Sequence, residues 1–254
     1  MLKSVLPRIL VAGVLLQSGL IAGELVKETF EEQAAAVETS DGGSRKVQWL
    51  VKEKGTLNVV DDSEGLASGK ALQNKQILGA LPPVILADPG DSVTVKFDFR
   101  LLSPLQNKDG YCPQFGLYYF EGAEAADPWN TSNGSGYYVG LNAAAAAGGV
   151  VIGKEQGKGP ILQGNDMTQL AKSSKELWVN DSKKHSAVLT ITALDSGVKI
   201  SVQLDGVAMT EYSDLLAPED LTLNRFALLA DPNTLLFDNF SVEVNMAGSN
   251  QTSP

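Results

Sequence analysis

Strict alternation of apolar and polar residues in the last third of the chain constrains the fold more than any other feature. In residues 185–206, apolar side chains recur at every second position on both sides of the turn Asp195-Ser196-Gly197, a pattern typical of a β-hairpin. Residues 235–244 alternate in the same way, and the face expected to be buried carries Leu236, Asp238, Phe240, Val242 and Val244. A carboxylate there is costly unless it is hydrogen-bonded or bound to a cation. Asp238 is therefore the most unusual position of the chain.

The same period of two predicts strands along most of the sequence. Its clearest early case is residues 92–101, which follow the turn Asp88-Pro89-Gly90-Asp91. We expect Pro82-Pro83 to stop a strand, the alanine run 143–147 to be a loop, and residues 167–178 to form one helix or a long crossover loop. Many short strands with few helices predict an all-β chain, a two-sheet antiparallel β-sandwich. The predicted strands are 46–51, 56–60, 68–75, 76–81, 92–101, 114–120, 136–141, 150–154, 187–193, 198–204, 225–230 and 235–244.

The N-terminal residues are typical of a secretory signal peptide. Lys3 and Arg8 form a short basic region, residues 9–21 are largely apolar, and the small residues Ala22 and Gly23 follow. The alternative is a membrane anchor that stays attached, although the apolar run is short for a full span. We expect a signal peptide at 1–23, one β-sandwich domain at 24–246 and a polar tail at 247–254. The expected location is secreted, periplasmic or on the cell surface.

Charge and cysteine content limit the partners of the chain. The net charge is −10 at pH 7, and loss of the two basic residues of the signal would make it −12. Nucleic acids and anionic membranes need a basic footprint, so neither is expected as a partner. Cys112 is the only cysteine, which excludes an intramolecular disulfide.

The order of these segments resembles the concanavalin A-like lectin/glucanase jelly roll, which includes LamG-like domains. The match is closest to uncharacterised exported bacterial proteins built around one such domain, and it spans most of residues 25–246. The resemblance implies a jelly-roll β-sandwich. Members of this superfold bind glycans, cleave or depolymerise them, or serve as surface modules, so the architecture does not choose an activity. The residues that carry the resemblance are 92–101 (SVTVKFDFRL), 115–120 (FGLYYF), 136–141 (GYYVGL), 185–206 and 235–244 (LLFDNFSVEV).

The resemblance also implies a structural Ca²⁺. In many calcium-bearing jelly rolls an acid near the N-terminus and one in the last strand share the ion, and the matching residues here are Glu31 and Asp238. Backbone carbonyls and water would complete the six to eight oxygen ligands of the ion. The alternative is that Asp238 accepts hydrogen bonds and no metal is bound.

The sequence assigns no catalytic residue. Hydrolases of this superfold usually carry Glu-x-Asp-x-x-Glu on one strand, which places two carboxylates on the same open face, and this chain lacks that pattern. Asp98 and Arg100 are expected to form an ordinary ion pair. His185 is the only histidine and opens a strand, which indicates a surface or turn position. Cys112 is expected to be a buried thiol without a catalytic role.

A glycan site needs exposed aromatic faces flanked by polar groups, because a sugar ring has apolar C–H faces ringed by hydroxyls. The candidates are Tyr118, Tyr138 and Trp129, with Arg100 and Gln114 as polar contacts. The alternative is that the tyrosines cover sheet edges or pack under loops.

We expect an exported, non-catalytic module that binds a polysaccharide or another glycan, or that contributes to the cell surface. A glycan-active hydrolase or lyase and a purely structural surface protein remain open. An exposed groove lined by Tyr118, Tyr138 and Arg100 would favour binding, facing carboxylates would favour hydrolysis, and a flat or covered face would favour a structural role.

Overall fold

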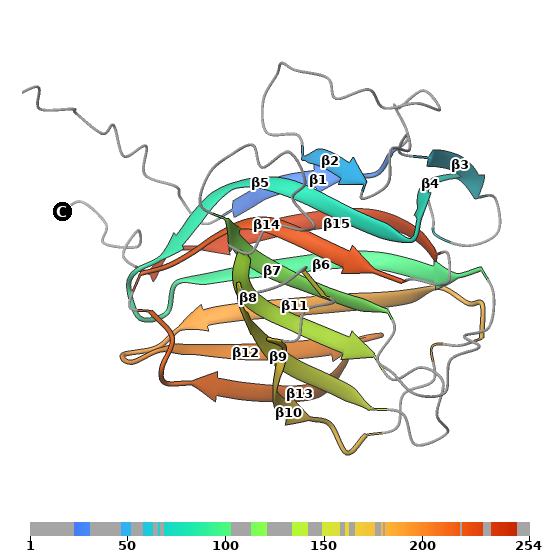
Figure 1. The fold of residues 1–254 in the computed structure, drawn as a ribbon. Helices are drawn as coiled ribbons and strands as arrows, with labels where there is room; N and C mark the ends of the chain where they lie inside the picture. Colours follow the sequence, from blue (N-terminus) through green and yellow to red (C-terminus); the bar gives the residue numbers. More distant parts are fainter. Residues whose placement is uncertain are drawn as a thin grey trace, which may run out of the picture.

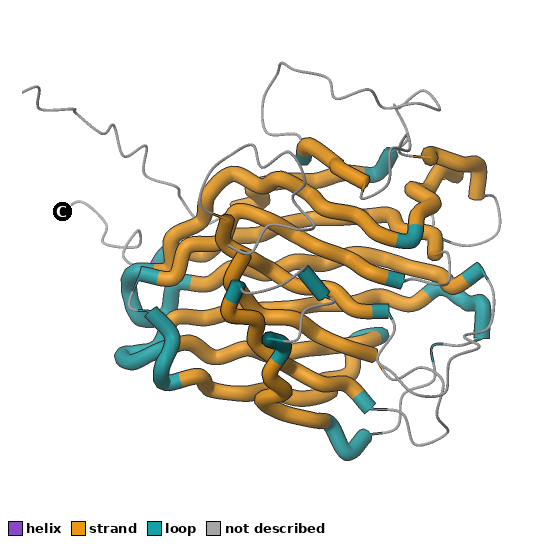
Figure 2. The backbone as a smooth tube through the Cα atoms, viewed as in Figure 1, coloured by secondary structure: helices purple, strands orange, loops and turns teal. Residues whose placement is uncertain are grey.

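The computed structural model is a sandwich of two antiparallel sheets, which confirms the predicted fold class and its jelly-roll type (Figure 1). The structure describes residues 23–30, 47–51, 58–62, 66, 69–102, 113–120, 134–141, 149–157, 161–162, 166–175, 179, 181–218, 220–230 and 235–247. Figure 2 shows that this part of the chain consists of strands joined by turns and loops. It contains no helix long and apolar enough to cross a membrane.

The first sheet has eight strands, and the predicted hairpin lies within it. Its order is β13-β12-β11-β6-β15-β4-β3. Strand β4 pairs with residues 235–237 of β15, and β1 pairs with residues 240–244 of the same strand. The hairpin pairs Ala187 with Leu204 and Ala193 with Val198, so the apolar residues of both strands share one face. Its strands are β1 (Gly23–Glu28), β3 (Asn58–Asp62), β4 (Gly69–Asn74), β6 (Ser92–Leu101), β11 (His185–Ala193), β12 (Val198–Leu204), β13 (Val207–Asp214) and β15 (Leu235–Asn245).

The second sheet has seven strands in the order β10-β9-β8-β7-β14-β5-β2. One face of each strand packs into the space between the sheets, where its apolar residues join the main core. Its strands are β2 (Gln48–Val51), β5 (Gln76–Leu86), β7 (Gln114–Phe120), β8 (Gly134–Leu141), β9 (Val150–Gln156), β10 (Thr168–Lys172) and β14 (Leu221–Leu229).

Aromatic rings from both sheets meet in the middle of this core. Trp49 lies edge-on to Phe237 and Phe240, with ring centroids 5.5 and 5.1 Å apart. Phe97 and Phe226 extend the contact toward β6 and β14, at 5.6 Å from each other. Aromatic rings at such spacings attract each other electrostatically, which stabilises the fold beyond the burial of their apolar area. The aromatic contacts therefore fix how the two sheets stack.

Polar contacts join the edges of the two sheets at β13. Asp214 accepts a hydrogen bond from the Tyr137 hydroxyl at 2.7 Å and pairs with Lys154 Nζ at 2.7 Å. The Ser173 hydroxyl donates to the carbonyl of Met209 at 2.9 Å. Burial alone would raise the pKa of Asp214, but hydrogen bonds from Lys154, Tyr137 and the Leu216 amide outweigh it, and the pKa is lowered.

A β-bulge in β15 reverses the predicted orientation of its first half. Phe237 pairs with Phe99 and Asp238 with Asp98, whereas Ser241 pairs with Lys96, so β15 holds one extra residue. That residue is Asn239, whose φ of 50° places it in the left-handed region. Phe237 and Phe240 consequently both face the core. Leu236 and Asp238 face outward, which corrects the expectation that they share the core face with Phe240.

The prolines and the segment after residue 166 also differ from expectation. Strand β5 continues through Pro82 and Pro83 because its pairing with β14 shifts at Leu223/Arg225, and β2 pairs only with residues 77–80. A proline is tolerated where no ladder hydrogen bond is required. Thr168–Lys172 is a strand rather than a helix, since it pairs with β9 and forms the edge of the seven-stranded sheet. Strands β1 and β13 are additional to those predicted.

The turn before β6 is tied to the C-terminal segment. The carboxylate of Asp91 accepts hydrogen bonds from the amides of Asp88 at 2.9 Å and Ala247 at 2.8 Å. The amide of Gly90 donates to the carbonyl of Ala193 at the end of β11. The predicted turn thus joins three segments at one end of the sandwich.

Candidate functional site

The predicted ligand-binding residues lie on opposite sheets. Gln114, Tyr118 and Tyr138 share the outer face of the seven-stranded sheet, on β7 and β8. Arg100 lies on the outer face of the eight-stranded sheet, where Nη2 contacts Oδ1 of Asp62 at 2.5 Å. The groove of Tyr118, Tyr138 and Arg100 that would have favoured binding is therefore absent among the described residues. Trp129 and Glu31 lie outside the described residues.

Cross-strand pairing aligns side chains in rows on the outer face of the seven-stranded sheet. One row runs from Arg225 on β14 to Tyr118 on β7, then to Gly136 on β8 and Glu155 on β9. Tyr118 therefore has Arg225 as its neighbour on one strand and, beyond a glycine, Glu155 on the other side. The Arg225 guanidinium lies over the ring of Phe120, 6.0 Å from its centroid. Burial lowers the pKa of Arg225.

A second row holds the other tyrosine. Ala227 pairs with Gly116, Gly116 with Tyr138, and Tyr138 with Gly153. In a third row, Leu229 has Gln76 on one side and Gln114 on the other. Two tyrosine rings thus stand between an arginine, an acid and two amides. We call Tyr118 and Tyr138 the tyrosine platform.

Glycines let both rings of the platform lie down against the sheet. A Cβ on Gly153 would stand 2.2 Å from Cζ of Tyr138, and one on Gly136 would stand 2.8 Å from Cδ1 of Tyr118. These distances are far below van der Waals contact, so each ring occupies space that any other residue would fill. Glycine in a strand costs stability. Here it allows a ring to lie across the neighbouring strand.

The platform is covered, which corrects the expectation of exposed rings. Tyr118 is 0% and Tyr138 is 6% exposed. Both belong to a small apolar cluster on this face that includes Ile161 and Leu162 and is flanked by Met167. The alternative of tyrosines packed under a loop is the arrangement observed. Ligand contact by the five predicted residues stays a prediction.

Glu155 is the titratable group of this face. It is 2% exposed, and its Oε1 accepts a hydrogen bond from the Leu162 amide at 2.8 Å. Burial raises the pKa of Glu155 to about 7, and the nearby carboxyl of Asp166 adds to the rise, while the Tyr118 hydroxyl and the Leu162 amide oppose it. A substantial fraction of Glu155 is therefore protonated at neutral pH.

The Tyr118 hydroxyl and Oε1 of Gln76 are buried on this face and make no hydrogen bond within the described part of the chain. The hydroxyl lies close enough to Glu155 to influence its pKa, but the contact lacks hydrogen-bond geometry. Burial and the nearby Glu155 raise the pKa of Tyr118. Unsatisfied buried polar groups are uncommon in folded proteins and call for an explanation.

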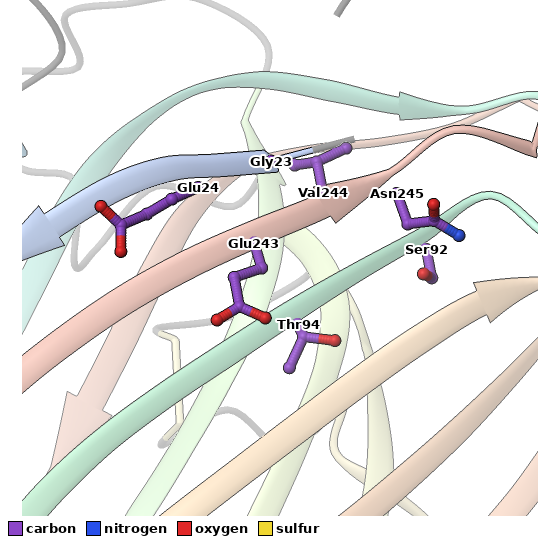
Figure 3. Close-up of a pocket in the computed structure, with 7 residues that line it drawn as sticks. All are labelled: Gly23, Glu24, Ser92, Thr94, Glu243, Val244 and Asn245. Atoms are coloured by element: carbon purple, nitrogen blue, oxygen red, sulfur yellow. The ribbon is translucent and has the colours of Figure 1, made fainter. Parts of the chain in front are cut away.

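The outer face of the eight-stranded sheet is polar and carries a shallow hollow. Figure 3 shows the hollow between β1, β15 and β6, with Glu24, Glu243 and Thr94 around it. Its volume is about 320 Å³, near the lower end of the usual range for ligand pockets. The described residues supply no aromatic ring to it. Glu243 is already paired with Lys96, whose Nζ lies 2.6 Å from Oε1.

Asp238 is fully buried, as the sequence suggested, although it faces outward. Its cross-strand partner Asp98 accepts from Nδ2 of Asn239 at 2.8 Å and pairs with Lys184 at 2.7 Å. Asp98 therefore pairs with Lys184 rather than with Arg100. The described residues contain no cluster of three or more acidic, histidine or cysteine side chains suited to a metal. Calcium at Glu31 and Asp238 stays a prediction.

His185 is buried rather than at the surface. Its Nδ1 lies 2.8 Å from Oδ2 of Asp205, and its Nε2 lies 3.0 Å from Oδ1 of Asp181. Burial alone would raise the pKa of Asp181, but hydrogen bonds from the Lys183 amide and from His185 outweigh it and lower the pKa. This cluster holds the start of β11 and gives no catalytic triad.

Sequence reasoning missed Arg225, Glu155 and Gln76. Arg225 and Glu155 are each the single charged residue in an otherwise apolar stretch of one strand face. That signal is visible in the sequence. Their position beside Tyr118 depends on the register of four strands, which the sequence does not show.

Comparisons with known proteins find no protein-family model and no curated protein that matches the chain. They do find solved structures of low sequence identity. A carbohydrate binding module, CBM66 from Bacillus subtilis, is 16% identical, with a TM-score of 0.43 over 77% of this chain and 94% of the module. The potassium-bound carbohydrate recognition domain of Emp46p is 13% identical, with a TM-score of 0.47 over 78% of this chain and 88% of that domain.

A third similar structure is domain 4 of AbnA, a GH43 extracellular arabinanase from Geobacillus stearothermophilus, in complex with arabinotriose. It is 17% identical, with a TM-score of 0.44 over 89% of this chain and 94% of that domain.

Proposed function

We propose that this protein is an exported, non-catalytic β-sandwich that binds carbohydrate on the outer face of its seven-stranded sheet. The observation that carries the proposal is the tyrosine platform, two rings laid flat on glycines with charged and amide groups beside them. Export follows from the signal-like residues 1–23, and its end point would be a periplasm, the cell surface or the medium.

The chemistry of the platform fits a sugar ring. The faces of Tyr118 and Tyr138 would pack against apolar C–H faces, and Arg225, Glu155 and Gln114 would bond to hydroxyls at the ring edge. A bound hydroxyl would also satisfy the Tyr118 hydroxyl, which lies beside Glu155 but makes no hydrogen bond of good geometry among the described residues. Carbohydrate recognition is the named role of CBM66 and of the Emp46p domain as well, but the proposal rests on the geometry of this chain.

A glycan array with residues 24–254, followed by calorimetric titration of each glycan that binds, tests the proposal. Loss of one stacking ring is expected to weaken binding by about 1–2 kcal/mol, or roughly 5- to 30-fold, so Tyr118→Ala and Tyr138→Ala should each reduce affinity. Tyr212→Ala on β13 is the matched control, since it removes a tyrosine from the other sheet. Binding that survives the double substitution of Tyr118 and Tyr138 would reject this site.

One observation favours glycan hydrolysis as a second candidate. Burial raises the pKa of Glu155 to about 7, and the carboxyl of Asp166 lies close enough to add to the rise. A carboxylic acid protonated at neutral pH beside a second carboxylate is an arrangement used for acid–base cleavage of glycosidic bonds. Release of reducing ends from a bound polysaccharide, lost by at least about 100-fold in Glu155→Gln, would support it. Bound polysaccharide that stays intact would reject it.

We also propose the structural Ca²⁺ that Glu31 and Asp238 would share, because Asp238 is a fully buried acid in the last strand. Melting with calcium and with excess chelator tests the ion. A calcium-dependent rise in Tm that Asp238→Ala abolishes is expected, and an identical Tm in chelator would reject it.

A further inference from the structure

We propose that Ile161 and Leu162 form a displaceable plug over the tyrosine platform, held closed by Glu155 through the amide of Leu162. The proposal rests on the function proposed above and adds the regulation of that site. Both residues are buried in the same apolar cluster as Tyr118 and Tyr138. A ligand that stacks on the rings must take the place of these two side chains.

The backbone of the plug is strained. Leu162 has a φ of 59°, in the left-handed region that a residue with a branched side chain rarely adopts. Such a conformation persists only where the surroundings hold it. The hydrogen bond from the Leu162 amide to Oε1 of Glu155, at 2.8 Å, is one such contact. Opening would release the strain and break this bond.

Closure also leaves a polar group poorly satisfied. The Tyr118 hydroxyl is buried without a hydrogen bond to the described residues. Water or a sugar hydroxyl could reach it once the plug moves aside. The closed form is therefore locally unfavourable at two points, the Leu162 backbone and the Tyr118 hydroxyl.

Protonation of Glu155 sets how firmly the plug is held. Burial raises the pKa of Glu155 from 4.5 to about 7 in the closed form. Opening would hydrate the carboxyl and return its pKa toward the ordinary value. The closed form therefore binds the proton more tightly. As pH rises from about 4.5 to about 7, the equilibrium constant for opening should increase by up to about 300-fold, because the pKa of Glu155 is about 7 in the closed form and 4.5 when it is hydrated.

The groups that face Glu155 come from each neighbouring element. They are the Tyr118 hydroxyl on β7, the Leu162 amide of the plug and the Asp166 carboxyl just after it. Tyr138 acts on Tyr118 from β8, and Arg225 stands one strand beyond Tyr118 in the same row. Burial raises the pKa of Tyr118 further above the stated pH range, so its hydroxyl stays neutral there, whereas the pKa of Glu155 is raised into this range.

Amide hydrogen exchange of the Leu162 N–H in ligand-free protein, measured by NMR from pH 4.5 to 7.5, tests the plug. After correction for intrinsic exchange, protection should fall by up to about 300-fold across this range. In Glu155→Gln it should stay constant, because a neutral amide replaces the titrating group. Glu243→Gln, on the opposite sheet, is the matched control and should behave like the unchanged protein. Protection independent of pH in the unchanged protein would overturn the proposal.

Titration with a glycan found on the array separates this proposal from the proposed function. Affinity should rise with pH between 5 and 7, and calorimetry in buffers of different ionisation enthalpy should show proton release that Glu155→Gln removes. A glycan that binds with unchanged affinity and no proton release would overturn the plug while leaving carbohydrate binding intact. If no glycan binds, the proposed function fails, and the exchange experiment alone then decides whether the plug opens.

Discussion

At the scale of single residues, the environment of Glu155 is the least ordinary. A nearly fully buried carboxyl bonded to the Leu162 amide favours its neutral form, because burial penalises the charge. The folded chain consequently binds a proton at Glu155 at a pH where the unfolded chain has released it. The residue links the covering of the tyrosine platform to pH.

The free energy of unfolding should fall as pH rises across the titration of Glu155. Its pKa in the folded chain, about 7, lies above the ordinary value of 4.5. The contribution of protonated Glu155 to the free energy of unfolding is therefore fully present below about pH 4.5 and absent above about pH 7. Between these values it should fall by about 3 kcal/mol. Urea unfolding at pH 5 and pH 8 measures it as the difference between the unchanged protein and Glu155→Gln.

Glu155→Gln should be more stable than the unchanged protein at pH 8 and similar to it at pH 5. Equal stability of the two proteins at both pH values would contradict the burial argument. Glu243→Gln, on an exposed part of the other sheet, should follow the unchanged protein at both pH values.

At the scale of elements, the bulge in β15 decides which side chains reach the core. Simple alternation from Leu236 to Val244 would place Asp238 on the core face. The extra residue Asn239 reverses the alternation before it, so Asp238 faces outward. The sequence predicted most strands correctly because their apolar residues alternate. It failed at Pro82-Pro83 and at β10, where edge position and pairing outweigh local preference.

Substitutions of Asn239 should separate its conformation from its hydrogen bonds. Its Nδ2 donates to the Leu66 carbonyl at 3.1 Å and to Asp98 at 2.8 Å. Asn239→Ala loses both bonds and strains the backbone, so we expect a loss of about 3 kcal/mol. Asn239→Gly loses only the bonds and should cost about 2 kcal/mol. Urea midpoints measure both, and a glycine variant less stable than the alanine variant would contradict a bulge with positive φ.

At the scale of the whole molecule, the two sheets form one sandwich with a shared aromatic core. Polar contacts of Asp214 on β13 with Tyr137 and Lys154 join the edges of the two sheets. The sequence was sufficient to predict this architecture. It also selected Tyr118, Tyr138 and Gln114 as candidates, and the structure places these three on one face. It could not predict that Arg100 lies on the other sheet, nor that Ile161 and Leu162 cover the rings. Both depend on contacts between distant segments that no local pattern encodes.

The contacts of Asp214 with Lys154 and Tyr137 predict that neutralising Asp214 lowers the free energy of unfolding by an amount that depends on pH. Although burial opposes ionisation, the bonds from Lys154 and Tyr137 dominate and lower the pKa of Asp214. The contribution of ionised Asp214 to the free energy of unfolding is therefore present above the ordinary pKa of an aspartate. It is lost as pH falls through the lowered pKa that Asp214 has in the folded chain. Asp214→Asn should cost about 2 kcal/mol at pH 7 and progressively less below pH 4. Acid and urea titrations followed by fluorescence measure this, and a cost that stays constant down to pH 2 would contradict it.

NMR mapping of a bound glycan tests the central claim most directly. With ¹⁵N-labelled residues 24–254 and a glycan selected from the array, amide shifts should concentrate at Gly116, Gly136, Gly153 and Leu162, around the tyrosine platform. Amides at the hollow near Ser92, Thr94 and Glu243 should stay unchanged. Shifts that concentrate at the hollow, with those four amides unaffected, would contradict carbohydrate binding on the seven-stranded sheet.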